Sequence, residues 1–361
     1  MPDTIALEEI GYSPRWEALF VPFAAQGLTP ARVVRSDRGS ALVASPAGLV
    51  RAEPSARLLK SAAGRARLPA VGDWVALLAR DDLDVPLIEA VLERASAITR
   101  GDPGKGSEAQ VLAANVDTVF VVHPIARPPN LRRIERELSL AWDSGAVPVV
   151  VLSKADLADD PAAARLSVEA IAFGVDVLLT SALAGEGLES LLAYLSGHRT
   201  AVLLGPSGAG KSTLVNALLG EQRQATREVR LSNGRGRHQT VARELIQLPG
   251  GGVLIDTPGL RALGLTGLEE GIASTFPEIG ELARSCRFAD CTHETEPSCA
   301  VRSAVESGEL PPERLASHHK LVREAQVAAM KTDARLRAEE ERKWKIIHKA
   351  AKGFYKITGK G

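Results

Sequence analysis

Three features are scarce in this chain of 361 residues: cysteines, long apolar runs and net charge. All three cysteines lie between Cys286 and Cys299, which argues against a disulfide framework. The first sixteen residues contain no apolar stretch of signal-peptide length. The longest buried-looking run, Val147 to Leu152, is too short to span a bilayer. We therefore expect a cytoplasmic protein that does not use a membrane.

The net charge of zero hides an uneven distribution. From Lys331 to Gly361 there are ten lysines and arginines against four acids. Seven cations follow the last acid, with Trp344, Phe354 and Tyr355 among them. These cations are Arg342, Lys343, Lys345, Lys349, Lys352, Lys356 and Lys360. A tail of this kind indicates electrostatic RNA binding, and a solvated helix end is the alternative.

The length and the 45% apolar composition indicate two or three domains. We expect the boundaries 1–98, 99–267 and 268–361, and we find no internal repeat. The first region has five short β-rich runs, at Ala31–Val34, Ala41–Ala44, Gly48–Arg51, Gly72–Leu78 and Leu87–Leu92. Five such strands predict a small RNA-binding barrel, either oligonucleotide-binding or SH3-like, or a barrel that only packs against its neighbour.

Apolar strands alternate with amphipathic helices in the second region, which predicts a doubly wound parallel sheet. The expected strands are Thr118–Val122, Val147–Leu152, Val175–Leu179, Ala201–Leu204 and Gly252–Ile255. One expected helix follows the cap Asn130 and carries Leu131, Ile134 and Leu138. After about Leu268 the strands stop, and we expect a helical domain with a basic tail.

A complete P-loop pattern runs from Gly205 to Ser212, between an expected strand and an expected helix. Small residues let successive backbone N–H groups turn toward phosphates, with a helix N-terminus behind them. Lys211 would add a positive charge between the outer phosphates, and the Ser212 hydroxyl would ligate Mg²⁺. A Gly-rich turn that binds nothing is the alternative.

A second phosphate-side motif, Asp256-Thr-Pro-Gly259, closes the strand Gly252–Ile255 and places a carboxylate where a magnesium-bound water is held. Between the two motifs runs the polar, Gly-rich stretch Leu231–Thr240, which we interpret as a switch loop. We expect Thr240 to sense magnesium beside the γ-phosphate.

Two further strand ends predict a site for guanine. Ser153-Lys154-Ala155-Asp156 resembles the Asn/Thr-Lys-x-Asp motif of GTPases. The Asp156 carboxylate offers only acceptors, which suit the N1–H and the amine of guanine and find no such donors on adenine. Ser153 departs from the usual residue, and we expect it to hold its neighbouring loop less firmly. Thr180-Ser181-Ala182-Leu183 resembles the second base-contacting loop.

These base-reading loops precede the P-loop, so the GTPase motifs run in circularly permuted order, which closely spaced domain termini permit. The expected GTP-binding residues are Ser153, Lys154, Ala155, Asp156, Ser181, Ala182, Gly205, Pro206, Ser207, Gly208, Ala209, Gly210, Lys211, Ser212, Thr213, Asp256 and Gly259. The expected magnesium ligands are Ser212, Thr240 and Asp256.

A metal site is expected at Cys286, Cys291, His293 and Cys299, which supply three thiolates and one imidazole within fourteen residues. Four such ligands without an open position favour one closed, structural Zn²⁺. Unligated buried cysteines are the alternative, although the acidic residues between them make poor core material.

Together these motifs resemble the ribosome small-subunit-dependent GTPase A (RsgA) family over nearly the whole chain. The resemblance is carried by Gln110–Asp117, Gly205–Ser212, Gly236–His238, Leu248–Gly259 and the Cys/His spacing. It implies an oligonucleotide-binding barrel, a permuted GTPase domain and a zinc domain. It also implies a role late in maturation of the small ribosomal subunit, with 16S rRNA as partner, and we expect a monomer.

Two departures bear on catalysis. The family commonly has consecutive threonines after the switch histidine, whereas this chain reads Gln239-Thr240-Val241. Leu260 stands where Ras-like enzymes have a water-orienting Gln, as is usual in the family. His238 then becomes the candidate to orient water, beside the catalytic Lys211 and Thr240, with an exposed loop histidine as the alternative. Two other functions stay open: an RNA-binding factor that only senses GTP, and a P-loop ATPase or kinase.

Overall fold

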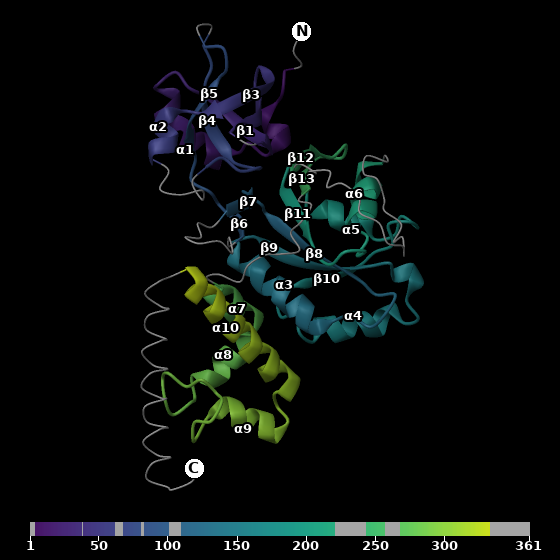
Figure 1. The fold of residues 1–361 in the computed structure, drawn as a ribbon. Coiled ribbons are helices and arrows are strands. Elements are labelled where there is room, and N and C mark those ends of the chain that lie inside the picture. Colours follow the sequence, from purple (N-terminus) through teal and green to yellow (C-terminus); the bar gives the residue numbers. More distant parts are fainter. Residues whose placement is uncertain are drawn as a thin grey trace, which may run out of the picture.

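The structure is a computed structural model that describes residues 4–37, 39–61, 68–80, 83–100, 110–220, 243–256 and 268–332. Three parts follow one another in space: a barrel, a sheet flanked by helices, and a group of helices (Figure 1). Among the described helices, none combines the length and the apolar character needed to cross a membrane.

Five strands form the N-terminal barrel, as the sequence predicts. They are β1 (Thr29–Ser36), β2 (Ala41–Ser45), β3 (Gly48–Pro54), β4 (Trp74–Leu78) and β5 (Leu87–Val91). Their order is β1-β2-β3-β5-β4, and β4 pairs back with β1. β3 and β5 run parallel, and the helix α2 (Ala56–Ser61) connects β3 to β4. This closed Greek-key arrangement is oligonucleotide-binding-like rather than SH3-like.

Short helices before the barrel were not predicted. η1 (Leu7–Ile10) and α1 (Pro14–Ala24) precede β1. η1 buries Leu7 and Ile10, and α1 buries Trp16 and Phe20, with the centroid of the Trp16 ring 6.1 Å from that of the Trp74 ring. Large aromatic side chains of this kind bury much apolar area, so they fix the helices on the barrel.

The central sheet is doubly wound, as predicted. Its strands are β8 (Thr118–Pro124), β9 (Val147–Ser153), β10 (Asp176–Leu179), β11 (Thr200–Leu204), β12 (Glu244–Gln247) and β13 (Val253–Asp256). The order is β10-β9-β8-β11-β13-β12, and all neighbours are parallel except the antiparallel pair β12–β13. Five of these strands are predicted from the sequence, and β12 is not.

Alternate residues of β8 face opposite sides of the sheet. Val119 and Val121 pack with the side of α3 (Leu131–Asp143) and α4 (Pro161–Glu169). Phe120 and Val122 pack with the side of α5 (Leu188–Ala193) and α6 (Lys211–Leu219). Helices therefore cover both faces, and loops at the carboxyl ends of the parallel strands meet at one edge.

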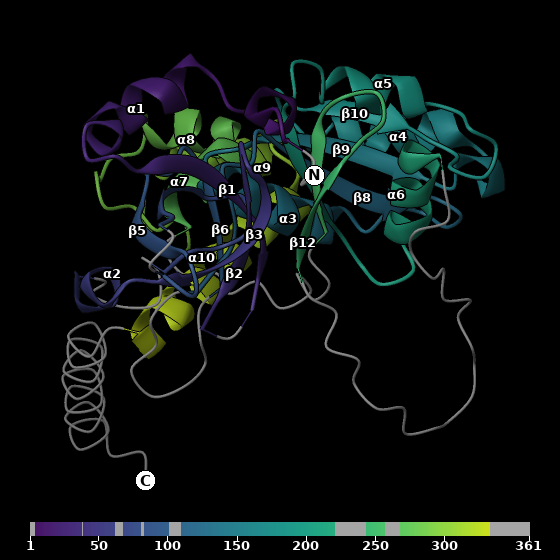
Figure 2. The same cartoon turned by 90° about the horizontal axis from the view of Figure 1, so that it is seen from above.

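The barrel continues the central sheet. β1 pairs antiparallel with β12, with Arg35 opposite Glu244, so one sheet of eleven strands runs through both parts. Figure 2 shows β12 between the barrel strands and the strands β8 to β10. A separate two-stranded sheet, β6 (Ala97–Arg100) and β7 (Gln110–Ala114), joins the two parts along the chain.

The C-terminal helical region consists of α7 (Glu269–Thr275), α8 (Pro277–Ala283), α9 (Ala300–Ser307) and α10 (Pro312–Thr332). These helices enclose their own apolar core, which includes Phe276, Val301 and Leu321. No strand occurs among the described residues after Leu268, as the sequence predicts.

Candidate nucleotide site and metal centre

The P-loop joins β11 to α6, and its backbone is shaped for close approach. Gly205, Gly208 and Gly210 all have positive φ angles, of 146°, 77° and 84°. A β carbon on Gly205 would lie 2.1 Å from the carbonyl oxygen of Val122 on β8. Only glycine fits here, so the loop starts directly against the end of β8.

The predicted phosphate-binding side chains lie around this loop. The Lys211 ammonium donates to the carbonyl oxygens of Gly205 and Pro206, at 2.8 and 2.7 Å, so it already lies over the loop. Ser212 and Thr213 follow in the first turn of α6, where N–H groups and the helix dipole favour anions. Asp256 is the last residue of β13, at the same edge of the sheet.

The base-reading loops contact the P-loop and one another. The buried Ser153 hydroxyl donates to the Ala209 carbonyl oxygen at 2.6 Å. Lys154 has a φ of 59°, and its Cε would lie 3.7 Å from a β carbon on Gly210. These contacts position the loop, so the shorter Ser153 side chain does reach the P-loop.

The second base-contacting loop lies directly beside the first. The Ala155 N–H donates to the Thr180 carbonyl oxygen at 3.1 Å. Ser181 is fully buried and exchanges backbone hydrogen bonds of 3.0 Å with Glu186, which closes a small turn around Ala182. Asp156 lies in the short helix η3 (Ala155–Leu157) and is exposed. Its carboxylate is therefore accessible to a base.

Several predicted residues lie outside the described part of the chain. They are His238, Thr240, Gly259, the rest of the proposed switch loop and the basic tail after Thr332. Their roles stay predictions.

Three polar residues with no predicted role bind near the start of the P-loop strand or the adjoining barrel. The Asp117 carboxylate accepts from the Thr200 N–H at 2.7 Å, at the start of β11. Arg32 on barrel strand β1 donates to the Thr200 hydroxyl at 2.8 Å, and burial lowers its pKa to about 10. Asn115 donates to the Gly72 carbonyl oxygen at 3.1 Å. The available signal was a polar residue within an apolar strand for Arg32, and two polar residues between two apolar strands for Asn115 and Asp117.

The four predicted zinc ligands come together. The ligand atoms of Cys286, Cys291, His293 and Cys299 all lie within 4.8 Å of one another. The Cys286 and Cys299 sulfurs are 3.9 Å apart, and His293 Nδ1 lies 3.4 Å from the Cys299 sulfur. Ligands about 2.3 Å from a tetrahedral Zn²⁺ are about 3.8 Å from each other, so these donors fit zinc.

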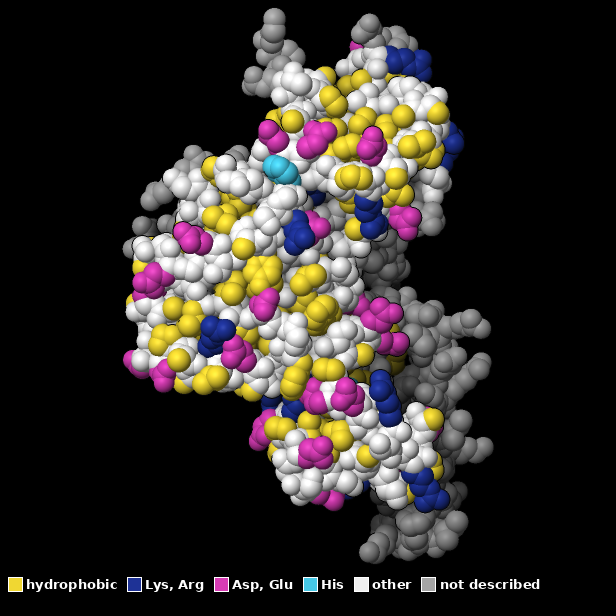
Figure 3. Space-filling view, turned by 180° about the vertical axis from the view of Figure 1, so that it is seen from behind, with side chains coloured by type: hydrophobic (Ala, Val, Ile, Leu, Met, Phe, Trp, Pro, Cys, Tyr) yellow, Lys and Arg dark blue, Asp and Glu magenta, His cyan; other side chains and the backbone are white. Residues whose placement is uncertain are grey.

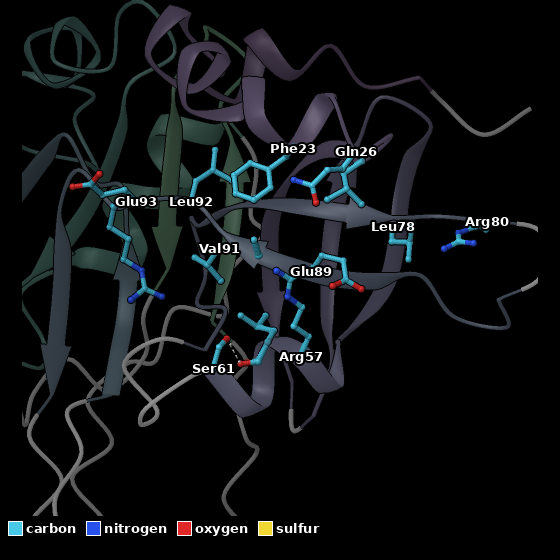
Figure 4. Close-up of a pocket in the computed structure, with 14 residues that line it drawn as sticks. Phe23, Gln26, Arg57, Ser61, Leu78, Arg80, Glu89, Val91, Leu92 and Glu93 are labelled. Atoms are coloured by element: carbon cyan, nitrogen blue, oxygen red, sulfur yellow. Dashed lines mark hydrogen bonds between the residues drawn. The ribbon is translucent and has the colours of Figure 1, made fainter.

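A separate cavity of about 920 Å³ lies in the barrel region. Figure 4 shows around it Phe23 of α1, Gln26 just after α1, Arg57 of α2 and Glu89 of β5. None of the residues that we predict to bind GTP or metal lines this cavity. It is therefore distinct from the nucleotide site.

The fold and the site define the class of protein: a P-loop GTPase whose base-reading loops precede the P-loop, flanked by a barrel and a Cys₃His cluster. A family model described as RsgA GTPase matches residues 91–266.

Curated relatives and a solved structure match over most of their length. The small ribosomal subunit biogenesis GTPase RsgA of Streptomyces coelicolor is 49% identical, over 96% of this chain and 94% of the relative. The protein of the same name from Opitutus terrae is 45% identical, over 99% of this chain and all of the relative. YjeQ from Thermotoga maritima superposes with a TM-score of 0.61 and 28% identity, over 82% of this chain and 98% of YjeQ. The chain belongs to the RsgA family of circularly permuted GTPases, and it is a GTP hydrolase.

Proposed function

We propose that this GTPase acts in biogenesis of the small ribosomal subunit and is switched by that subunit. The proposal rests on one observation. The P-loop and the two predicted base-reading loops meet at one edge of the central sheet, between the barrel and the C-terminal helical region. The curated relatives named above match nearly the whole chain, and their names give small ribosomal subunit biogenesis as their role. Acting on ribosomal subunits implies work in the cytoplasm, and we infer a monomer.

We assign the nucleotide site to the predicted residues. Asp156 reads guanine, with the backbone at Ser181 and Ala182 beside it. The P-loop from Gly205 to Thr213 holds the phosphates through backbone N–H groups and Lys211. When bound, Mg²⁺ neutralises charge on the phosphates, and Ser212, Thr240 and Asp256 are its proposed ligands. Zn²⁺ is assigned a structural role at the Cys₃His cluster, which has no open position for a reacting water.

We assign RNA contacts to the barrel and the basic tail, with the domain boundaries 1–98, 99–267 and 268–361. On the face shown in Figure 3, the described cations are interspersed with acids over the barrel and the central sheet. In this proposal, the ten lysines and arginines among residues 331–361, against four acids, supply most of the attraction to 16S rRNA.

Stimulation by the subunit follows from the missing glutamine. Leu260 cannot orient water, so His238 must be placed by ordering of the switch loop. Positioning and charge stabilisation of this kind are worth about 10³- to 10⁵-fold in related phosphoryl transfers. By linkage, the GTP form binds the subunit more tightly than the GDP form, and hydrolysis becomes the release signal.

The test is steady-state GTP hydrolysis with purified small subunits, large subunits and neither, with ATP in parallel. We expect stimulation by small subunits alone, and its loss in His238→Ala but not in the neighbouring control Gln239→Ala. Equal rates in all three conditions contradict activation and favour a GTP sensor. Turnover of ATP at the GTP rate favours the ATPase alternative.

A further inference from the structure

Helix α3 carries two buried glutamates that face opposite sides. Glu135 and Glu137 are 3% and 5% exposed. Residues two positions apart on a helix are about 200° apart around its axis, so the two side chains point away from each other. A buried carboxylate is costly unless it is bound, and each of these is bound by a different part of the molecule. In Figure 1, α3 lies between the central sheet and the C-terminal helical region.

Glu137 binds the end of β8, which supports the P-loop. Its Oε2 lies 2.6 Å from Nε2 of the buried His123, and its Oε1 accepts from Arg133 at 3.0 Å. His123 directly follows Val122, whose carbonyl oxygen packs on Gly205 at the start of the P-loop. Glu137 thus binds the strand end against which the first residue of the P-loop packs.

The same strand end also supports the far side of the P-loop. Pro124, next to His123, lies in register with Ser153 on β9. The Ser153 hydroxyl donates to the Ala209 carbonyl oxygen within the P-loop at 2.6 Å. A shift of the β8 end would therefore disturb the P-loop at both of its ends.

Glu135 binds the C-terminal helical region. Its carboxylate accepts from Arg314 at 2.6 Å and from the Ser317 hydroxyl, both on α10. Arg314 also binds Glu278 on α8 and the Thr275 carbonyl oxygen on α7, both at 2.6 Å. One arginine therefore connects α3 to three helices of the C-terminal region.

Close backbone packing between α3 and α7 adds to the contacts of Arg314. A β carbon on Gly271 of α7 would lie 2.1 Å from the Ser139 carbonyl oxygen on α3. The Ser139 hydroxyl donates to the Thr275 hydroxyl at 3.0 Å. Because α7 lies directly on the backbone of α3, the two helices must move together.

We propose that His123 and Glu137 are positioning residues for GTP hydrolysis, and that the C-terminal helical region fixes them through Glu135 on the opposite side of α3. The P-loop works by aiming backbone N–H groups at phosphates, and a displacement of about 1 Å can cost a large factor in rate. Removing the Glu137 carboxylate leaves the buried His123 imidazole without this partner. Removing the Glu135 carboxylate detaches Arg314 from α3 and leaves it only its contacts with Glu278 and Thr275. In either case we expect α3 and the end of β8 to shift.

The first experiment separates positioning from stability at Glu137. Glu137→Met removes both acceptors, whereas Glu137→Gln keeps one carbonyl acceptor at the same length. We expect Glu137→Met to lower kcat/KM for GTP about tenfold or more in the zinc-loaded full chain without ribosomes. It should also speed release of methylanthraniloyl-GDP, and Glu137→Gln should recover most of both properties.

Glu169→Met is the matched control. Glu169 also pairs with an arginine four residues earlier on its helix, Arg165 at 2.6 Å, but on the surface of α4. This variant should leave kcat/KM and methylanthraniloyl-GDP release unchanged. All rates are taken well below the melting temperature of each variant.

The second experiment tests the connection across α3. Glu135→Met should change kcat/KM and methylanthraniloyl-GDP release in the same direction as Glu137→Met. The double variant should lose less than the product of the two single effects, because both act by releasing one helix. If a methionine variant fails to fold, Glu135→Gln, Glu137→Gln and His123→Asn provide the same comparison, each with a smaller loss in kcat/KM.

Two outcomes overturn the proposal. Folded variants with lower melting temperatures but parental kcat/KM and nucleotide release would show that both glutamates serve stability alone. An effect of Glu137→Met without any effect of Glu135→Met would remove the C-terminal helical region from P-loop positioning.

Discussion

Residues 153–156 divide two tasks among neighbouring side chains. Ser153 is buried and bound to the P-loop, and Lys154 lies beside Gly210. Asp156 is exposed and lies just after the backbone contact of Ala155 with Thr180. Ser153 and Lys154 thus hold the loop, and we propose that Asp156 reads the base, so a change at Asp156 should spare the fold.

We predict that Asp156→Asn lowers the affinity for GTP, and equally for GDP, about 10- to 100-fold, because its amide can present a donor toward guanine's own donors. Xanthine nucleotide should be partly accepted instead. Titration calorimetry with GDP and XDP measures both affinities. Asp159→Asn, also an exposed carboxylate of the same loop, is the control and should bind GDP like the parent. Parental GDP affinity in Asp156→Asn would disprove the assignment.

The contact between helices α3 and α7 places two acidic residues, Asp143 and Glu270, close together. Burial, and then the negative charge of Glu270, raise the pKa of Asp143 to about 6. The folded state therefore binds this proton more tightly than the unfolded state, whose pKa is about 3.9. Unfolding free energy should fall as the pH rises from about 4 to about 6, and the loss should persist above that range.

Asp143→Asn removes this titration. Relative to the parent, we expect the variant to gain unfolding free energy as the pH rises through that window, reaching about 1 kcal/mol at neutral pH after discounting for solvent screening. Urea unfolding of both proteins at pH 4.5, 6 and 7.5 gives the difference. A pH-independent difference in unfolding free energy between Asp143→Asn and the parent would refute the raised pKa.

Loss of the metal should affect only the structure around its four ligands. Cys291→Ser or chelation should loosen residues 286–299, where the four ligands lie. Nucleotide binding should survive, because the contacts of Arg314 with Glu135 and Glu278 come from helices outside this segment. Limited proteolysis and GDP binding measure the two effects. Metal analysis that finds no zinc in protein prepared without chelator would contradict the ligand set.

Sequence patterns predicted elements well where apolar periodicity was strong. All five barrel strands and five central strands were expected, and Asn130 caps α3 by accepting from the Arg133 N–H at 3.2 Å. β12 was missed because its four residues, with polar ends, form a short antiparallel strand. The register that closes the barrel depends on pairing between β1 and β4, which no local pattern contains.

The nucleotide loops and the Cys₃His cluster were predictable because their chemistry needs fixed local spacing. The burial of charged residues could not be predicted in this way. Arg314 and Glu135 each resemble surface residues on amphipathic helices, and only their meeting across α3 and α10 makes burial tolerable. Long-range pairs of this kind depend on how domains pack, which one sequence does not reveal.

At the scale of the whole molecule, the barrel and the central sheet are one sheet through β1 and β12. β12 begins at Glu244, four residues after the end of the segment that we interpret as the switch loop. Arg32 of the barrel also binds Thr200 at the start of the P-loop strand. A shift of the barrel on binding RNA would therefore be transmitted to residues next to the switch loop and the P-loop. Such a connection is consistent with activation by a docked partner.

The basic tail is the remaining route to a partner, and it lies outside the described residues. We predict that truncation after Ala338 weakens binding to small subunits and flattens its salt dependence. Each lost phosphate contact should reduce the slope of log affinity against log salt by about 0.7 to 0.9. Sedimentation binding at four salt concentrations measures both quantities, with the GTP form of each protein.

A full-length variant with the seven tail cations changed to glutamine separates charge from length. It should reproduce the lower affinity and flatter slope of the truncated protein, because counterion release depends on charge. A variant with Trp344, Phe354 and Tyr355 changed to leucine should lose affinity while it keeps the parental slope, since base stacking releases no ions. Parental affinity and slope after truncation would show that residues 339–361 are a solvated end, and RNA contacts would then have to come from the barrel.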